Sequence, residues 1–588
     1  MGEDRRARWK PRASGEARDL RTDALRTVVA LFALAVCGKL FLLQVMDHPL
    51  YAALAEGQHG IFRELFPTRG DVLVHDMKDG ALVTAATNQR LALVYADPRR
   101  VEDAAKTAGL LGELFGYDEE RIEALEKRLG QREDPYEPIE RHVDGATLAR
   151  VHALALAGVK DVPEETRFYP ESGLGGHVFG FLGADDDGKR SGKYGIEGYF
   201  DQELSGTMGF VRSERDISGR LIAVGEHSVE PAVDGADVVL TLDRTIQYRA
   251  CQAITQAVRR HQADGGSVVI MEPSTGRILA MCAAPDFDPN DYGDVDSVRV
   301  FNNPAIFDAY EPGSVFKAVT MAAALDAGAV TPDTIYEDVG VVKIDGFDIK
   351  NSTGAANGWQ SMTQALEKSL NTGMIFAMRQ VGRDAFEDYV RRFGFGSRTG
   401  VELDTEVAGD LKGLDKAGEV FAATASYGQG ITVTPLQIAS AYAAIANGGI
   451  LKKARIVDEV RSPDGRVDAR ATEDVRRVIE PKTAKTLAAM LISVVENGHG
   501  KKAGVKGYYV AGKTGTAQVA RADAAGYEEH ATIGTFAGFA PADDPKFAMV
   551  VRIDRPADAV FAESTAAPVF GELAKFLLEY FEVSPNRN

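Results

Sequence analysis

Tyr310-Glu311-Pro312-Gly313-Ser314-Val315-Phe316-Lys317 joins a helix-start signal to a serine and a lysine. Pro-Gly favours a helix start, and residues three apart share a helix face, so Ser314 Oγ and Lys317 Nζ are expected to approach hydrogen-bonding distance. A serine hydroxyl is a weak nucleophile and needs a base. Shielding by Phe316 and Met321 is expected to lower the pKa of Lys317, because burial disfavours the charged amine. The stretch therefore predicts a serine nucleophile with a lysine base.

Two later motifs strengthen this hypothesis. Ser369-Leu370-Asn371 falls at a break between two helical runs, and Lys513-Thr514-Gly515-Thr516 lies in the strand-like run GYYVAGKTGTAQVA. A hydroxyl–amide pair can relay a proton and hold a substrate amide. A Lys/Thr-rich edge strand with glycines can bind a carboxylate while its backbone pairs with an extended peptide. S-x-x-K, S-x-N and K-T-G in this order are typical of β-lactamases and penicillin-binding proteins.

The sequence around these motifs predicts an α+β domain over residues 236–582. GSVVIMEP and GRILAMCAA form a hairpin candidate, four helical runs follow, and three strand candidates precede a terminal helix, PVFGELAKFLLEYFEV. A strand pair, a helical middle and three closing strands indicate an antiparallel sheet covered by helices. Residues 583–588 are expected to form a loose tail.

The N-terminal region is interpreted as a membrane anchor. Residues 27–46 read TVVALFALAVCGKLFLLQVM, about the length needed to cross a bilayer, although Lys39 and Gln44 interrupt the run. Residues 1–26 hold eight basic and five acidic residues, so the positive-inside rule predicts a cytoplasmic tail and export of the rest across the plasma (inner) membrane. A cleaved signal peptide and a buried core helix are the alternatives.

Residues 47–235 are expected to form a second module, an α/β pedestal domain. Residues 61–96 show strand-like alternation, residues 101–160 show helical periodicity, and glycine-rich strand-like sequence resumes from 167 to 233. A turn cluster, PAVDGAD, precedes a strand VVLTLD and a helix starting near Arg244. The boundary to the catalytic domain is therefore placed near residues 231–236.

Composition and charge exclude several function classes. The chain of 588 residues has a net charge of −19, which makes a nucleic-acid partner a poor match. Its three cysteines cannot form a disulfide scaffold, and its ten scattered histidines show no zinc-site spacing, so no metal and no cofactor are expected. Gly507–Thr514 formally fits a phosphate-binding loop, but strand-like sequence follows it where that loop needs a helix, so nucleotide binding is rejected.

With these motifs in place, the chain resembles the class B penicillin-binding proteins, the monofunctional peptidoglycan transpeptidases of bacteria. The resemblance covers nearly the whole chain. The sequence of the segment Tyr310–Ser314 is more similar to that of the septal, cell-division branch than to that of the elongation branch. Further segments that carry the resemblance are Arg69-Gly70-Asp71, Arg167–Pro170, His177, Gly195–Gly198, Leu240–Asp243, Tyr427–Gly430 and Thr434–Gln437.

This resemblance implies a role for each motif residue. Ser314 attacks the penultimate D-alanine carbonyl of a peptidoglycan stem peptide and forms an acyl-enzyme, with Lys317 as the base. Ser369 and Lys513 return the proton to the leaving amine, and Asn371 holds the donor amide. Thr514 and Thr516, on either side of Gly515, meet the carboxylate. The amides of Ser314 and Thr516 form the oxyanion hole.

The resemblance also implies ligands and partners. β-Lactam antibiotics imitate the D-Ala-D-Ala end and leave Ser314 acylated. The expected protein partners are a membrane glycosyltransferase of the shape–elongation–division class and other division proteins. Two alternatives stay open: a hydrolase with the same motifs, either a D,D-carboxypeptidase or a β-lactamase, and a non-catalytic membrane scaffold that binds partners through residues 47–235.

Overall fold

The computed structural model describes residues 20–41, 60–171, 173–184, 190–214, 228–293, 295, 297–521 and 526–587. Its contacts divide the chain into two compact units. The first comprises residues 1–66 and 208–232, and the second comprises residues 67–207 and 233–588. The first unit holds the helix α1 (Leu20–Phe41) and a sheet of three antiparallel strands, β1 (Gly60–Leu65), β8 (Gly209–Glu214) and β9 (Ser228–Glu230).

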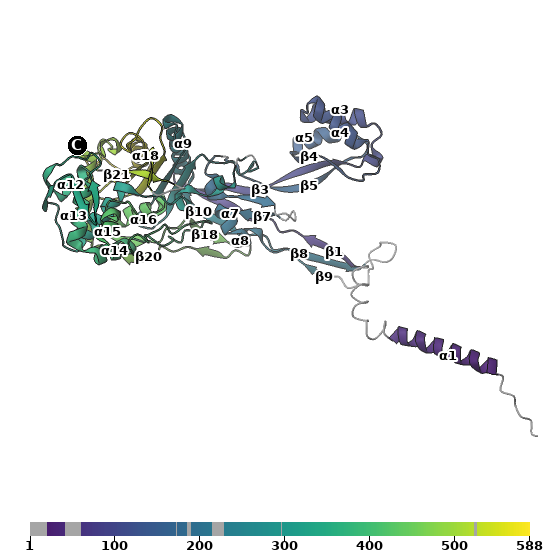
Figure 1. Cartoon of the computed structure of the whole chain (residues 1–588). Helices are drawn as coiled ribbons and strands as arrows, with labels where there is room; N and C mark the ends of the chain where they lie inside the picture. Colours follow the sequence, from purple (N-terminus) through teal and green to yellow (C-terminus); the bar gives the residue numbers. More distant parts are fainter. Residues whose placement is uncertain are drawn as a thin grey trace, which may run out of the picture. The chain divides into compact units, whose positions relative to one another are not determined.

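A five-stranded antiparallel sheet forms the core of the catalytic region, as the sequence predicts (Figure 1). The strand order is β12-β11-β23-β22-β21, so the strand that carries Lys513 lies at an edge. The hairpin of β11 and β12 aligns Val268 with Cys282. The strand bounds are β11 (Gly265–Met271), β12 (Ile278–Ala284), β21 (Ala511–Ala520), β22 (Tyr527–Ala540) and β23 (Phe547–Asp554).

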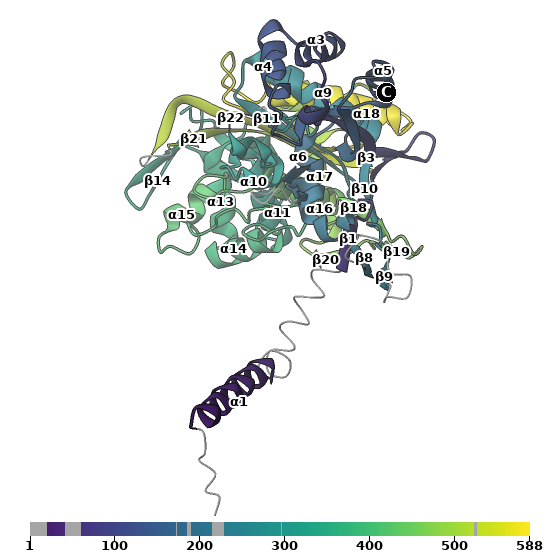
Figure 2. The same ribbon diagram turned by 90° about the vertical axis from the view of Figure 1, so that its right-hand side faces the viewer.

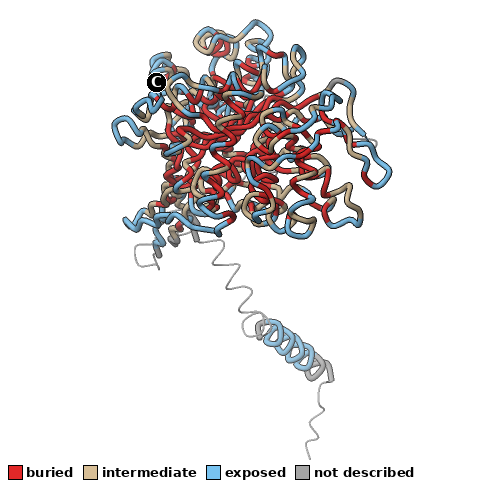
Figure 3. Tube along the Cα trace, turned by 90° about the vertical axis from the view of Figure 1, so that its left-hand side faces the viewer, coloured by how far each residue is buried: buried red, intermediate tan, exposed pale blue. Residues whose placement is uncertain are grey.

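Helices cover both faces of this sheet because successive residues of each strand point to opposite faces. Val268 and Ile270 pack in one cluster with α9 (Arg244–His261) and α18 (Ala566–Tyr580). Val269 and Met271 pack in another cluster with α11 (Lys317–Asp326) and α16 (Pro435–Ala446). Figure 2 shows these two helix layers on either side of the strands, and Figure 3 shows the buried residues concentrated in the interior.

The remaining helices of the catalytic region position the motif residues or close the helical layer. α10 (Pro304–Phe307) and the 3₁₀ helix η4 (Gly313–Phe316) precede α11. α12 (Met362–Glu367) and α13 (Asn371–Val381) flank the second motif, and small hairpins pair β13 (Ile335–Asp338) with β16 (Gly358–Ser361) and β14 (Val341–Ile344) with β15 (Phe347–Lys350). The others are α14 (Arg383–Arg392), α15 (Glu419–Ala425) and α17 (Pro481–Asn497).

A second sheet of seven strands runs across the expected domain boundary. Its order is β19-β18-β10-β2-β3-β4, with β5 also paired to β3. β10 (Asp237–Asp243) pairs parallel with β2 (Val72–Asp76) and antiparallel with β18 (Val457–Arg461), so it joins the N-terminal module to a strand from the catalytic region. The other strands are β3 (Ala81–Ala96), β4 (Glu137–Val143), β5 (Val159–Phe168) and β19 (Val467–Ala469).

The N-terminal module holds the helices that its periodicity predicts, together with strands and short helices that it does not. α3 (Ala104–Phe115), α4 (Glu119–Leu129) and α5 (Gly145–Ala153) fall in the stretch predicted as helical, but β4 interrupts it between α4 and α5. The glycine-rich stretch read as strand includes α6 (Gly176–Phe179), α7 (Gly195–Tyr199) and α8 (Asp201–Ser205) beside β6 (Phe181–Ala184) and β7 (Arg190–Lys193).

Several of the segments that carry the resemblance meet at the buried carboxylate of Glu197. Its two oxygens accept hydrogen bonds from Arg69 Nε and Arg167 Nε, each at 2.7 Å, and Tyr169 OH donates to one of them at 3.3 Å. Arg69 also donates to Asp201 at 2.8 Å. A buried charge is tolerated only when it is paired and hydrogen-bonded, so this network holds together segments that lie far apart in the sequence.

The predicted membrane anchor is only partly within the described residues, since residues 42–46 lie outside them. α1 covers residues 27–41, and Phe32 and Leu34 on it are 71% and 74% exposed. In the parts of the chain that the structure describes, no helix is both long enough and apolar enough to span a membrane. The prediction of a spanning helix is therefore not confirmed. Its apolar run is short, because α1 begins with LRTD and has Lys39 in its last turn.

The structure also bears on the expectations for the C-terminal tail and for the cysteines. Residues 583–587 are not a loose tail: Tyr508 OH donates to Val583 O at 2.7 Å, and the amides of residues 586 and 587 both donate to Gly507 O at 3.1 Å. The cysteines form no scaffold, but Cys251 of α9 and Cys282 of β12 are joined in one disulfide, with their Cα atoms 5.1 Å apart. Sequence spacing alone cannot reveal this pairing, because it depends on the packing of α9 against β12.

Candidate active site

The predicted nucleophile lies in a tight turn held from several sides. Ser314 is the second residue of η4 and is partly exposed, whereas its neighbours in the turn are buried. Gly313 N donates to Gly428 O at 2.9 Å, and the buried Tyr442 donates its hydroxyl to Val315 O at 2.8 Å. These bonds fix the backbone on both sides of Ser314, so its hydroxyl is presented from a rigid support.

Lys317 begins α11 and is completely buried at 0% exposure. Its Nζ donates to Ser369 O at 2.6 Å, Asn371 Oδ1 at 2.7 Å and Ser369 Oγ at 3.2 Å. Among the described residues none of its hydrogen bonds goes to Ser314, so the direct contact expected from the spacing is not seen here. All three of these partners belong to the second motif, which helix spacing alone does not reveal.

Ser369 Oγ lies between two amines. Lys513 Nζ donates to it at 2.9 Å and to Thr514 O at 2.9 Å, while Lys317 approaches it from the first motif. Ser369 lies between α12 and α13, as predicted, and its φ of 55° is in the left-handed region that L residues rarely adopt. Such strain persists only where the surroundings impose it, and it gathers at functional sites.

Burial of the two lysines changes their acidity. The pKa of Lys317 lies well below its ordinary value, first because burial disfavours the charged amine and second because Lys513 is a like charge nearby. Burial lowers the pKa of Lys513 to about 7. The site therefore stabilises neutral amines near neutral pH, which a base or a proton relay requires.

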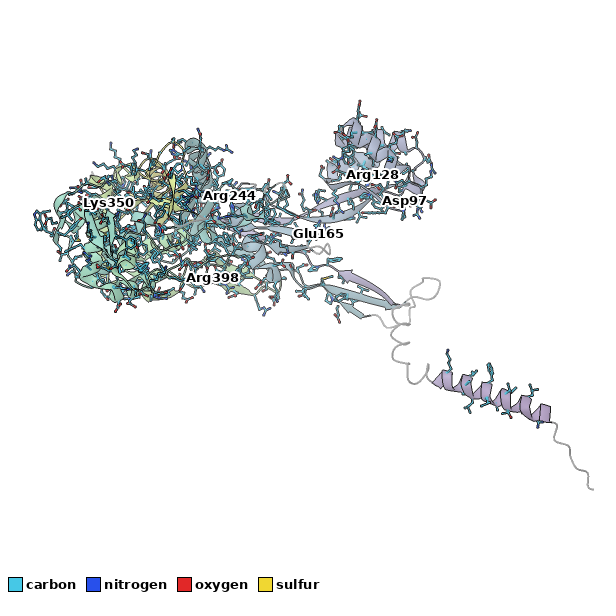
Figure 4. The ribbon with its side chains drawn as sticks, in the orientation of Figure 1. Asp97, Arg128, Glu165, Arg244, Lys350 and Arg398 are labelled. Carbon is cyan, nitrogen blue, oxygen red and sulfur yellow. A yellow bond between two sulfur atoms is a disulfide. The ribbon has the colours of Figure 1, made fainter. Side chains whose placement is uncertain are left out.

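Asn371 begins α13 and holds the second motif in place. Its Nδ2 donates to Lys350 O at 2.9 Å, while its Oδ1 accepts from Lys317; Lys350 is labelled in Figure 4. The next residue, Thr372, donates its hydroxyl at 2.7 Å to the buried carboxylate of Asp338, which also accepts from Asn351 at 2.9 Å. Asp338 thereby anchors the start of α13 beneath the site.

The strand β21 passes directly over the nucleophile turn. A Cβ on Gly515 would lie 3.0 Å from both Pro312 O and Val315 N, so glycine is needed for this approach. Thr514 is buried, and Thr516 Oγ1 accepts from Ala562 N at 3.1 Å, which leaves its hydroxyl proton available to a ligand. Gly512 makes room for the ring of Phe536 rather than for a peptide, because a Cβ there would lie 2.6 Å from Phe536 Cζ.

The structure thus brings the three motifs together, with Ser314, Lys317, Ser369, Asn371 and the Lys513–Thr516 segment around one site. It also bears out the rejection of a phosphate-binding loop, since residues 511–520 form a strand and the next described element is another strand. His177 is a packed residue: it is 3% exposed and its Nε2 lies 2.8 Å from Val300 O.

Sequence reasoning missed the group of polar residues on the other side of the turn. Glu311 accepts hydrogen bonds from Gly430 N at 2.9 Å and from Tyr527 OH at 3.0 Å. Burial raises the pKa of Glu311, and the Glu311 charge adds to burial in raising the pKa of Tyr427. Glu311 is only three residues before Ser314, and this closeness in sequence to the nucleophile could have identified it as a candidate site residue.

Comparisons with known proteins agree with this geometry. Residues 266–575 match the family described as the penicillin-binding protein transpeptidase domain, and residues 64–240 match the penicillin-binding protein dimerisation domain. The chain is 34% identical over 527 residues to stage V sporulation protein D of Bacillus subtilis, covering 89% of this chain and 80% of the relative. It is 30% identical to the probable peptidoglycan D,D-transpeptidase PbpC of Pseudomonas aeruginosa, covering 97% of each chain.

A solved structure gives the same result. The crystal structure of penicillin-binding protein 3 from Mycobacterium tuberculosis in complex with aztreonam superposes with a TM-score of 0.67 at 28% identity. The match covers 89% of this chain and 98% of that structure. With two family domains, relatives at 30% identity or more and a shared fold, the chain belongs to the class B penicillin-binding protein transpeptidases.

Proposed function

We propose that the chain cross-links peptidoglycan stem peptides as a serine D,D-transpeptidase, through an acyl-enzyme on Ser314. The observation that carries this proposal is the position of Ser369 Oγ, 3.2 Å and 2.9 Å from the amines of two buried lysines beside the nucleophile turn. Membership of the transpeptidase family supports it, and the relative from Pseudomonas aeruginosa is named as a probable peptidoglycan D,D-transpeptidase.

In the proposed acylation, Ser314 Oγ attacks the carbonyl between the last two D-alanines of the donor. Lys317, which is neutral because of its burial, takes the hydroxyl proton. The proton then passes through Ser369 and Lys513 to the departing D-alanine amine, so the peptide bond breaks as the ester bond forms. The amides of Ser314 and Thr516 stabilise the oxyanion that develops in between.

Substrate binding is assigned to β21 and the start of α13. The donor peptide pairs with the exposed edge of β21, its terminal carboxylate meets Thr514 and Thr516 beside Gly515, and Asn371 holds its amide. A β-lactam that occupies the same positions acylates Ser314. The solved relative with bound aztreonam supports this assignment by analogy.

In the cell, we assign the chain to septal wall synthesis on the basis of the segment Tyr310–Ser314. Residues 1–26 would remain in the cytoplasm, residues 27–46 would attach the chain to the membrane, and the catalytic domain would lie outside it. The exposed apolar side chains of α1 and its basic flank support this arrangement. We place the pedestal at 47–235 and the catalytic domain at 236–582. The proposed partners are a shape–elongation–division glycosyltransferase and other division proteins.

Product analysis with a D-Ala-D-Ala stem peptide tests the activity. Purified chain is incubated with the donor, with and without an acceptor peptide that carries a free amine. We expect D-alanine release that yields a cross-linked product when the acceptor is present, and no release by Ser314→Ala. Rapid release in water alone, unaffected by acceptor, would favour a hydrolase. A Ser314→Ala gene that still sustained growth would favour a scaffold.

A further inference from the structure

A cavity of about 570 Å³ lies at the end of the catalytic sheet, next to the nucleophile turn. Its walls come from the middle of β22, from the ends of β11, β12, β21 and β23, and from the segment that precedes Ser314. Both acidic and basic side chains line it, including Asp308, Glu311, Arg299 and Arg552. The motif residues proposed above do not line this cavity, so it is free to bind a second molecule.

Most of the carboxylates in the cavity already have a cationic partner. Asp554 lies 2.6 Å from Arg552, Asp264 lies 3.4 Å from Arg555, and Asp308 lies 3.6 Å from Arg299. Glu311 differs from these three. Its two oxygens accept only from an amide and a hydroxyl, and it forms no ion pair with any residue that the structure describes. The pKa of Glu311 is raised by burial, consistent with a carboxylate that lacks a cation.

The segment that carries Glu311 leads directly into the nucleophile turn. Glu311 is three residues before Ser314, and a Cβ on Gly313, between them, would lie 3.2 Å from Thr516 O and 3.3 Å from the Cβ of Ala517. The strand continues from there to Gln518, which lines the cavity about 7 Å beyond Thr516 at the rise of a strand. The cavity therefore begins where the proposed donor site ends.

We propose that this cavity is the acceptor site, in which Glu311 binds the ammonium group of the stem peptide that receives the acyl chain. The proposal rests on the transpeptidase function proposed above. In the transfer step, the ammonium first loses one proton, the neutral acceptor nitrogen attacks the ester carbonyl, the bond to Ser314 Oγ breaks and an amide bond forms. Of the three ammonium protons, one stays on the amide, one returns to Ser314 Oγ and one is released to solvent.

The test separates acylation from transfer in the purified full chain. Glu311→Gln keeps a side-chain oxygen as an acceptor but removes the charge, and Asp308→Asn is the matched control, because Asp308 lines the same cavity and is already paired with Arg299. The donor is a D-Ala-D-Ala stem peptide, and the acceptor probe is the tripeptide N-acetyl-L-Ala-γ-D-Glu-L-Lys, whose only amine is on the lysine side chain. The readouts are the penicillin acylation rate, the ratio of cross-linked to hydrolysed product, and the acceptor concentration that gives half-maximal transfer.

We expect Glu311→Gln to raise the half-maximal acceptor concentration about ten-fold or more, as loss of a charge-assisted bond requires, with acylation within about three-fold of the unmodified chain. Asp308→Asn should change transfer less than about three-fold. An unchanged product ratio, or transfer and acylation falling in parallel, would overturn the proposal. So would a fall in hydrolysis alone, because Glu311 would then activate water. If the unmodified chain formed no acyl-enzyme, the proposed function itself would fail.

Binding to the unmodified protein gives a second measurement that does not depend on a folded variant. The full chain, acylated with penicillin, is titrated in a calorimeter with the tripeptide and with the same tripeptide acetylated on its lysine side chain. Acetylation removes the positive charge and should weaken binding about ten-fold or more. Equal affinity for the two tripeptides would overturn the assignment of Glu311.

Discussion

Replacing Ser369 with alanine removes the hydroxyl that joins the two buried amines. Lys317 and Lys513 donate to this hydroxyl at 3.2 Å and 2.9 Å, and a hydrogen bond between neutral groups is worth about 0.5–1.5 kcal/mol. Losing both in the transition state therefore costs about 1–3 kcal/mol, or roughly 5- to 100-fold in the rate of acylation. The assay is the second-order rate of labelling with a fluorescent penicillin.

A second variant separates chemistry from backbone strain. Ser369→Gly also lacks the hydroxyl, but glycine adopts the φ of 55° found at this position without a steric cost. Ser369→Gly should acylate as slowly as Ser369→Ala, and its melting temperature should be no lower than that of Ser369→Ala. If Ser369→Ala acylated within about three-fold of the unmodified chain, Ser369 would not be the proton relay and the reasoning would be refuted.

Three further predictions concern stability. Glu197→Gln should destabilise the fold by about 3–5 kcal/mol, measured by thermal unfolding, since it removes the charge paired with two buried arginines; Glu165→Gln, at a half-exposed ion pair, should cost less than about 1 kcal/mol. Folding lowers the pKa of Lys513 to about 7 from 10.5, so the unfolded chain binds more protons than the folded chain between these pH values. The Lys513 contribution to the free energy of unfolding should therefore rise from pH 7 to 10.5. In denaturant titrations repeated across this pH range, Lys513→Met should show a smaller rise of the free energy of unfolding with pH. Reducing the Cys251–Cys282 disulfide, which closes a sequence separation of 31, should cost roughly 3–4 kcal/mol in the same titrations, whereas an unchanged midpoint would show that the bond does not constrain the unfolded chain.

Local sequence patterns predicted the strands and helices of the catalytic region because the formation of these elements depends mainly on residues that are near one another in the sequence. Short apolar runs identified β11 and β23, and a Pro-Gly signal identified the start of the helix that carries Lys317. The order of the three motifs indicated a common site, and the edge position of β21 followed from its composition. These features depend on neighbours within a few residues, so they can be read without coordinates.

Long-range pairing explains what the sequence did not reveal. The parallel pairing of β10 with β2, and its antiparallel pairing with β18, join residues more than 150 positions apart, and no local pattern encodes such a register. Lys317 donates its hydrogen bonds to the second motif, more than 50 positions away, and local spacing does not predict such contacts. Glu311 was overlooked because an acidic residue near a nucleophile has meaning only when its partners are known.

The most direct test of the account is the site of covalent attachment of a penicillin. The full chain is incubated with the drug, digested, and mapped by mass spectrometry, with Ser314→Ala treated in parallel. We predict one adduct per chain, on Ser314, and none on the variant. An adduct on another residue, or equal labelling of the variant, would contradict the claim that the converging motifs activate this hydroxyl.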